Sequence, residues 1–177
     1  MNNKEKKQFN RVKALAHRKV ELANRDAFRE DITALEQGMA DLPQCYSGYE
    51  FDEINPLKHS FGDGCYIREI FMPRGQILVT KIHKKTHPYF VMSGDISIGS
   101  EKGVERVLAP YTGITEVGTK RIIYTHEDTV FITVHATKET DLKKIEKEVI
   151  ASDFDEIDEL EAQKYIDIIF NEKEEQL

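Results

Sequence analysis

Four histidines stand in or beside short runs of strand-forming residues, where folding could bring their side chains together. His83 and His87 lie close in the sequence, and His126 and His135 follow in later runs. Neutral imidazole nitrogens are common ligands of zinc, iron and nickel. His83 and His87 with either His126 or His135 could therefore form a three-histidine metal site. In the opposing interpretation, His126 is a surface turn residue and His135 is merely half-buried.

The segment that must position these histidines runs from Cys65 to Thr137 and has the texture of a β protein. Its runs of β-branched and aromatic residues are CYIREIFM, QILVTKIH, PYFVMSG, DISIG, VERVLA, KRIIYT and TVFITVHA. Short strands at intervals near ten residues, with turn signals between them, predict an antiparallel sandwich or barrel. Strand alternation predicts one shared inner face, formed by Ile77, Val79, Lys81, His83, His87, Tyr89 and Val91.

Helices are predicted on both sides of this β segment. Residues 4–41 lack proline and carry apolar stripes at helical spacing, which fit either one long helix or two with a break at 24–26. Residues 45–64 are interpreted as a loop, and 141–150 and 156–172 as helices. The predicted organisation is an N-terminal helical extension (1–43), a β-barrel (44–137) and acidic C-terminal helices (138–177).

The composition limits the class of protein. A chain of 177 residues with 40% hydrophobic residues fits one core with appendages. It contains no apolar run of about 20 residues and no secretory signal, so a cytoplasmic protein without a membrane partner is predicted. Its net charge of −7 is concentrated in residues 138–177, which carry 6 basic and 14 acidic side chains. The basic start of the chain lacks a nucleic-acid-binding motif, so a nucleic-acid partner is not predicted. Cys45 and Cys65 are expected to be reduced.

The β segment resembles the cupin superfamily of small jelly-roll barrels. The spacing of the first cupin motif is matched by Gly75, Lys81, His83, His87 and Gly94, between the phrases MPRG and YFVMSG. The second motif is matched at spacing by Pro110, Glu116, Gly118, Arg121 and Thr125, of which only Gly118 is identical. The resemblance implies a mainly β fold, with one antiparallel jelly-roll barrel and α-helical extensions at both ends. The short chain, rich in Lys, Glu, Ile and Asn, also resembles small cupin-like proteins of bacteriophages.

The departures from the cupin pattern bear on the site. The resemblance places metal ligands at four positions that are Lys81, His83, His87 and Arg121 here. An ammonium and a guanidinium cannot ligate a divalent cation, so the usual metal cofactor is not expected. These residues with Tyr89 are instead predicted to bind an anionic small molecule such as a phosphate, carboxylate or nucleotide group. Alternatively, Lys81 and Arg121 reach the rim or pair with acids.

Two functions therefore remain open. The first is a non-enzymatic binding or assembly protein, homo-oligomeric through its sheets or its apolar helices, with an anionic ligand in the barrel. The alternative is a metal-dependent cupin enzyme in which a divalent transition metal is held by His83, His87 and a third ligand outside the family pattern, such as His126. No GxSxG or P-loop signature is present, and no catalytic residue is assigned.

Overall fold

The computed structural model describes residues 3–174, in two units that are described separately. One unit is the N-terminal segment through Cys45 with Glu101–Gly103, and the other contains the rest of the chain. The N-terminal segment forms one uninterrupted helix, α1 (Asn3–Ala40). One long helix is thus found, because Asn24–Asp26 contains neither glycine nor proline and its residues cost only a few tenths of a kcal/mol each in a helix. Among the described residues, no helix is long and apolar enough to cross a membrane.

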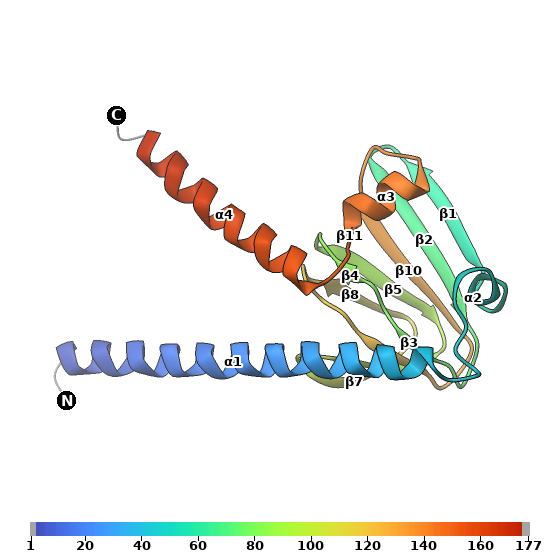
Figure 1. Ribbon diagram of the computed structural model, residues 1–177, viewed down its shortest axis with the longest axis horizontal. Helices are drawn as coiled ribbons and strands as arrows, with labels where there is room; N and C mark the ends of the chain where they lie inside the picture. Colours follow the sequence, from blue (N-terminus) through green and yellow to red (C-terminus); the bar gives the residue numbers. More distant parts are fainter. Residues whose placement is uncertain (1–2, 175–177) are drawn as a thin grey trace. The chain divides into compact units, whose positions relative to one another are not determined.

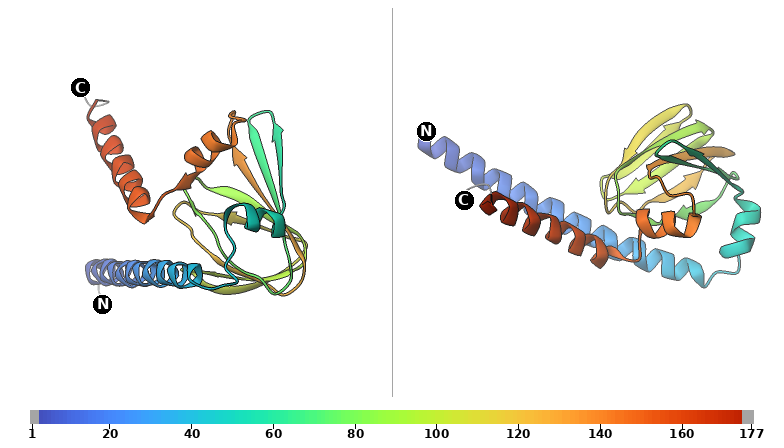
Figure 2. Two further views of the ribbon diagram at one scale, coloured as in Figure 1. Left: turned by 45° about the vertical axis from the view of Figure 1, so that its right-hand side comes forward. Right: turned by 90° about the horizontal axis from the view of Figure 1, so that it is seen from above.

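The second unit contains two larger antiparallel sheets, which curve around a common interior (Figure 1, Figure 2), and a two-stranded sheet described below. The five-stranded sheet has the order β1 (Leu57–Gly62), β2 (Cys65–Met72), β10 (Thr129–Ala136), β5 (His87–Ser93) and β8 (Tyr111–Thr115). The four-stranded sheet has the order β3 (Ile77–Val79), β9 (Ile122–Thr125), β6 (Asp95–Ser100) and β7 (Gly103–Leu108). The predicted mainly β jelly-roll fold with helices at both ends is confirmed.

The register of the central strands decides which side chains face the interior. In β10 the alternate residues Thr129, Phe131, Thr133 and His135 are buried. Phe131 pairs with Val91 of β5, whereas the preceding Val130 pairs with Ser93, so Met92 is an extra residue in β5. Beyond this β-bulge the inward residues of β5 lie opposite the inward residues of β10, Val91 opposite Phe131 and Tyr89 opposite Thr133.

Apolar side chains fill one part of the interior. The main core cluster consists of Ile70, Met72, Leu78, Tyr89, Val91, Ile96, Ile98, Val107, Ile123 and Phe131. These residues come from both sheets, so their burial holds the sheets together. The polar residues described below occupy the ends of the same strands, beyond this core.

Three elements before residue 137 were not predicted from the sequence. Residues 45–64 contain a short helix, α2 (Gly48–Ile54), and strand β1, where a loop was expected. Strand β8 lies in the predicted turn between Pro110 and Gly118. Both missed strands are short and lie at the edges of their sheet, where only one neighbour selects for strand-forming side chains.

The C-terminal segment begins with the two predicted helices. These are α3 (Leu142–Val149) and α4 (Phe154–Glu174), joined by the short strand β11 (Ile150–Ala151). Figure 1 shows α3 beside the ends of β2 and β10, where Ile145 and Val149 pack on Tyr66. Strand β11 pairs with a two-residue strand, β4 (Ile82–His83), and so joins the C-terminal segment to the barrel.

Candidate functional site

Two inward-facing histidines lie at the ends of neighbouring strands. His87 begins β5 and His135 lies near the end of β10, and their side chains are almost fully buried. Their ring centroids are 4.3 Å apart. The pairing of Thr133 with Tyr89, two residues away from each histidine, accounts for this approach.

His83 completes the group from a different element. It lies on β4, and its ring centroid is 4.3 Å from that of His87 and 5.7 Å from that of His135. One ring nitrogen from each of the three residues lies within 4.8 Å of the other two. The structure therefore brings together three of the four histidines singled out from the sequence.

Each of the three rings has a buried nitrogen without a hydrogen-bond partner among the described residues, and two of the rings are held through their other nitrogen. Nδ1 of His87 lies 3.0 Å from the carbonyl oxygen of Lys85, and Nε2 of His135 lies 3.1 Å from Oγ1 of Thr133. Nε2 of His87, Nδ1 of His135 and Nδ1 of His83 are buried and have no hydrogen-bond partner among the described residues. Buried polar atoms normally have a partner, so three orphaned nitrogens in one place require an explanation.

The three imidazoles are neutral. Burial, together with the neighbouring His87 and His135, lowers the pKa of His83 to about 2. Burial likewise lowers the pKa of His135 to about 4 and lowers that of His87. A neutral imidazole whose N–H is held by one partner presents its other nitrogen as a lone pair, which is the form that binds metals.

This donor set fits a divalent transition metal. Three imidazoles suit zinc, copper, iron or nickel, and three protein ligands leave a coordination position open. In a tetrahedral site with metal–nitrogen distances of about 2.0–2.1 Å, two ligand nitrogens are about 3.3–3.4 Å apart. The ring nitrogens of His83, His87 and His135, which lie within 4.8 Å of one another, would therefore have to move closer together on binding.

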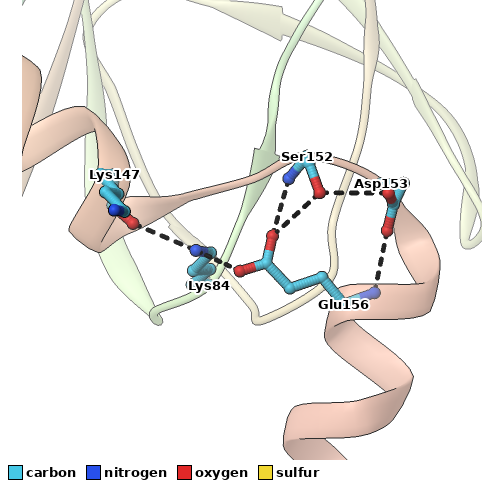
Figure 3. A network of polar contacts seen from close by, with 5 residues as sticks. All are labelled: Lys84, Lys147, Ser152, Asp153 and Glu156. Atoms are coloured by element: carbon cyan, nitrogen blue, oxygen red, sulfur yellow. Dashed lines mark hydrogen bonds and ion pairs between the residues drawn. The ribbon is translucent and has the colours of Figure 1, made fainter.

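The C-terminal segment holds the β4 turn that carries His83. Ile150 and Ala151 pair with His83 and Ile82, and the backbone N–H of Lys84 donates to the carbonyl of Val149 at 2.8 Å. Figure 3 shows the adjoining polar network, which contains Lys84, Lys147, Ser152, Asp153 and Glu156. We call these contacts the C-terminal clamp.

Lys84 is the centre of the clamp. Its ammonium forms an ion pair with Glu156 and donates to the carbonyl of Lys147 at 3.1 Å. Glu156 also accepts from the backbone N–H of Ser152, and Asp153 accepts from that of Glu156, both at 2.9 Å. The last two bonds cap the start of α4.

Glu148 joins the same segment to the other two histidines. Its carboxylate pairs with Lys85, two residues from His87, and accepts from Oγ1 of Thr137 at 2.8 Å, two residues from His135. The chain neighbours of all three histidines are thus fastened to the segment from Glu148 to Glu156.

Arg121 and Tyr89, predicted as ligand-binding residues, lie together in the barrel wall. The guanidinium carbon of Arg121 is 4.6 Å from the centroid of the Tyr89 ring, and Nη1 donates to Oγ1 of Thr115 at 2.8 Å. Thr115 in turn pairs with His87 across β5 and β8. Burial raises the pKa of Tyr89 to about 12, so its hydroxyl is protonated.

Gly113 makes room for Tyr89. A Cβ atom at this position would lie 2.5 Å from the Tyr89 hydroxyl oxygen. The ring of Tyr89 therefore crosses β8 directly over the backbone of Gly113, with which it is paired.

Lys81 does not lie with the histidines. Its side chain is largely exposed, and its ammonium forms an ion pair with Glu146 of α3. The expected alternation from Ile77 to His83 is wrong, because β3 ends at Val79 and β4 begins at Ile82. Ile77 is exposed and Leu78 is buried, so the break between the strands changes which residues face the interior.

His126 also lies apart from the histidine group. Its Nε2 is 2.8 Å from Oγ1 of Ser97, and its ring meets the edge of Tyr124. Ser97 alternates with the buried Ile96 and Ile98, so this pair belongs to the outer face of the four-stranded sheet. The histidine that lies beside His83 and His87 is therefore His135 and not His126.

Arg68 is an inward-facing residue that sequence reasoning missed. It pairs with Thr133 on β10, and it alternates with the buried Tyr66 and Ile70. Its charge contributes to the lowered pKa values of His83 and His135. The alternation of β2 carried the signal, but both faces of this strand contain apolar residues, so its inner face was ambiguous.

The chain was compared with protein families, curated proteins and solved structures. No family model and no curated protein matches the chain. It is similar to a cupin domain of an XRE family transcriptional regulator from Enterobacter cloacae, at 10% identity and a TM-score of 0.40, over 46% of this chain and 94% of the other.

Two further solved structures are similar to the same part of the fold. For the Schizosaccharomyces pombe Cnp3 cupin domain, the identity is 16% and the TM-score 0.41, over 54% of this chain and 72% of the other. For an acetylacetone dioxygenase from Acinetobacter johnsonii, the identity is 15% and the TM-score 0.40, over 54% and 76%. The chain is thus similar, over about half its length, to cupin-type structures.

Proposed function

We propose that this protein is a cupin-like barrel that binds one divalent transition metal through His83, His87 and His135. The observation that carries the proposal is the convergence of three histidines that each bring a ring nitrogen within 4.8 Å of the other two and that each have a buried nitrogen without a hydrogen-bond partner among the described residues. The metal-dependent alternative predicted from the sequence is thereby favoured over a barrel without a cofactor, with His135 as the third ligand.

Two physical arguments support metal binding over a purely structural cluster. An orphaned buried acceptor costs about 1–3 kcal/mol, and three such atoms would be a large uncompensated burden for a small barrel. In addition, the Lys85 carbonyl and Thr133 Oγ1 occupy the second nitrogens of His87 and His135, as outer partners do in histidine metal sites. An open coordination position would allow metal-dependent catalysis, which we propose as the enzymatic form of this function.

The test is metal binding by the full chain purified without an affinity tag. Native mass spectrometry and titration with Zn²⁺ or Co²⁺ should show one ion per chain. His135→Asn should lower the affinity by more than the roughly 10- to 100-fold typical of losing an outer partner. His126→Asn is the matched control and should bind like the wild type. Absence of binding by the wild type, or equal loss in both variants, would contradict the proposal.

Anion binding at Arg121 is a second candidate function. It is supported by the position of the Arg121 guanidinium over Tyr89, next to Thr115 and therefore near His87. Titration with sugar phosphates and nucleotides should show affinity that an Arg121→Ala variant loses. A Lys81→Ala variant should behave like the wild type, because Lys81 pairs with Glu146 away from the histidines. Affinity that is absent, or indifferent to Arg121, would reject this candidate.

Homo-oligomeric assembly is also retained as a proposal, because β7 ends its sheet with exposed apolar side chains. Val104 and Leu108 are 82% and 70% exposed. An apolar strand at a sheet edge is suited to pairing with another copy. Light scattering after size exclusion should show an oligomer that Val104→Lys with Leu108→Lys dissociates, while Val117→Lys does not. A monomeric wild type would exclude this assembly.

A cytoplasmic location and a bacteriophage origin of this protein remain predictions.

A further inference from the structure

We propose that the three-histidine centre takes a small oxyanion, a carboxylate or a phosphate, and that Arg68 is the residue that recognises it. This inference rests on the proposed metal site and names the class of its exogenous ligand. Arg68 is not among the site residues that the cupin resemblance supplied. It is identified by the register of β2 and by the groups around the Arg68 guanidinium.

The strand register places Arg68 beside the histidines. It is paired with Thr133, whose hydroxyl contacts His135, and the next inward residue of β2, Tyr66, is paired with His135 itself. The ring of Tyr66 stacks on that of His135, with 5.9 Å between centroids. Arg68 therefore occupies the position diagonal to His135 on the same inner face, within reach of a long side chain.

Arg68 is half-buried and makes no hydrogen bond or ion pair with any described residue. Its neighbour Glu69 faces the other way and pairs with Lys58. The acids whose charges act on Arg68 are Asp52, which is exposed, and Glu146, which is already paired with Lys81. Burial lowers the pKa of Arg68, yet a guanidinium stays protonated at any ordinary pH. A cation in this position lacks an anionic partner of its own.

Loading the metal site would increase this imbalance. The histidine group contributes no carboxylate, so a dication held by three neutral imidazoles would stand next to the Arg68 cation without compensation. Uncompensated charges are costly away from water. An oxyanion removes the imbalance at both places, because one oxygen can occupy the open position of the metal and the others can accept from the guanidinium. The planar fork of arginine matches carboxylate and phosphate oxygens.

The experiment uses the full chain loaded with Co²⁺, whose visible absorption reports on coordination. Acetate and phosphate are titrated at constant ionic strength, with perchlorate as the balancing salt. Each anion that binds should change the Co²⁺ spectrum with saturation, and the two arms show which oxyanion is preferred. Arg68→Met should weaken the anion by about 10- to 100-fold, as expected for loss of a charge-assisted hydrogen bond. Its Co²⁺ affinity measured without anion should not fall.

Two further variants make the outcome decisive. Arg68→Lys keeps the charge and should bind the anion with intermediate affinity, which also covers the case in which the methionine variant does not fold. Arg74→Met removes an exposed arginine at the end of β2 and should behave like the wild type. A bound Co²⁺ whose spectrum ignores both anions, or an anion affinity indifferent to Arg68, would overturn this inference and leave the metal site intact. Absence of Co²⁺ binding would instead refute the metal site, and this inference with it.

Discussion

The rings of His87 and His135 lie 4.3 Å apart, between two neighbouring strands, with their outward nitrogens held by Lys85 and Thr133. Two imidazolium ions could not share this space without strong repulsion, and His83 is just as close to His87. The folded barrel therefore requires all three rings to be neutral, which has consequences for stability as well as for binding.

The first prediction is that the metal-free protein loses stability as the pH falls below about 6.5. In the unfolded chain a histidine takes up a proton near pH 6.5, whereas in the folded protein the pKa is about 4 for His135 and about 2 for His83. Between these pH values the unfolded state binds more protons than the folded state. The free energy of unfolding therefore falls as the pH is lowered, by up to about 1.4 kcal/mol per pH unit for each histidine.

Thermal melts in EDTA from pH 8 to pH 4.5 measure this effect. The melting temperature should be nearly level above pH 7 and should decline below pH 6.5. A variant with His83→Asn and His135→Asn should decline less steeply, and His126→Asn should follow the wild type. Equal slopes for the wild type and the double variant would show that the buried histidines are not the cause.

A second prediction concerns Thr133, which orients His135. Thr133→Val keeps the shape of the side chain and removes the hydroxyl that contacts Nε2 of His135. Metal affinity should fall by about 10- to 100-fold, the usual effect of losing an outer partner of a histidine ligand. Isothermal titration with Zn²⁺ measures the change. Thr112→Val, at an exposed position of β8, serves as the control, and a Thr133 variant with unaltered affinity would argue against Nδ1 of His135 as a ligand atom.

A third prediction tests the close contact between Gly113 and Tyr89. Gly113→Ala would place a methyl group against the Tyr89 ring, which must then move from its position beneath Arg121. Overpacking of this kind costs about 1–3 kcal/mol, to be measured by urea denaturation. Gly99→Ala is the matched control in β6, where a Cβ would meet its nearest neighbour at an ordinary 3.8 Å. Similar stabilities for the two variants would show that the Tyr89 ring has room to yield.

A fourth prediction concerns the C-terminal clamp. Glu156→Gln removes the charge that pairs with Lys84 and weakens the cap of α4. The pairing of β11 with β4 should open more often, and the amides of the β4 turn should exchange faster with deuterium. Glu159→Gln, an exposed position in the same helix, is the control. Unchanged exchange around His83 in the Glu156 variant would show that the strand pairing alone holds the turn.

The fold was predictable where hydrophobic texture and turn signals agree. The β segment, the inward alternation of His87, Tyr89 and Val91, and both C-terminal helices followed from periodicity. Periodicity failed at the break between β3 and β4. No proline or glycine marks residues 80 and 81, so the sequence gives no sign that the alternation restarts, and Lys81 was placed inside.

The site was only partly predictable, because its residues meet through tertiary contacts. His83 and His87 are close in the chain, but the choice between His126 and His135 depends on which strand lies beside β5. His126 is nearer in the sequence, and its partner Ser97 lies on the far side of a sheet. Arg68 belongs to a strand whose two faces are similarly apolar, so only the pairing with β10 identifies its direction.

The extra residue Met92 lies between two consecutive pairs of the β5–β10 ladder. It contributes no ligand and its side chain is exposed. Removing it would leave Val130 paired with Ser93 and Phe131 paired with Val91, now as neighbouring pairs of a regular ladder, so His87, Tyr89 and Val91 would keep their register against β10. An insertion of one residue between His87 and Val91 would instead turn His87 to the other face of the sheet, away from His135. The site should therefore tolerate a change of chain length at position 92 but not between positions 87 and 91.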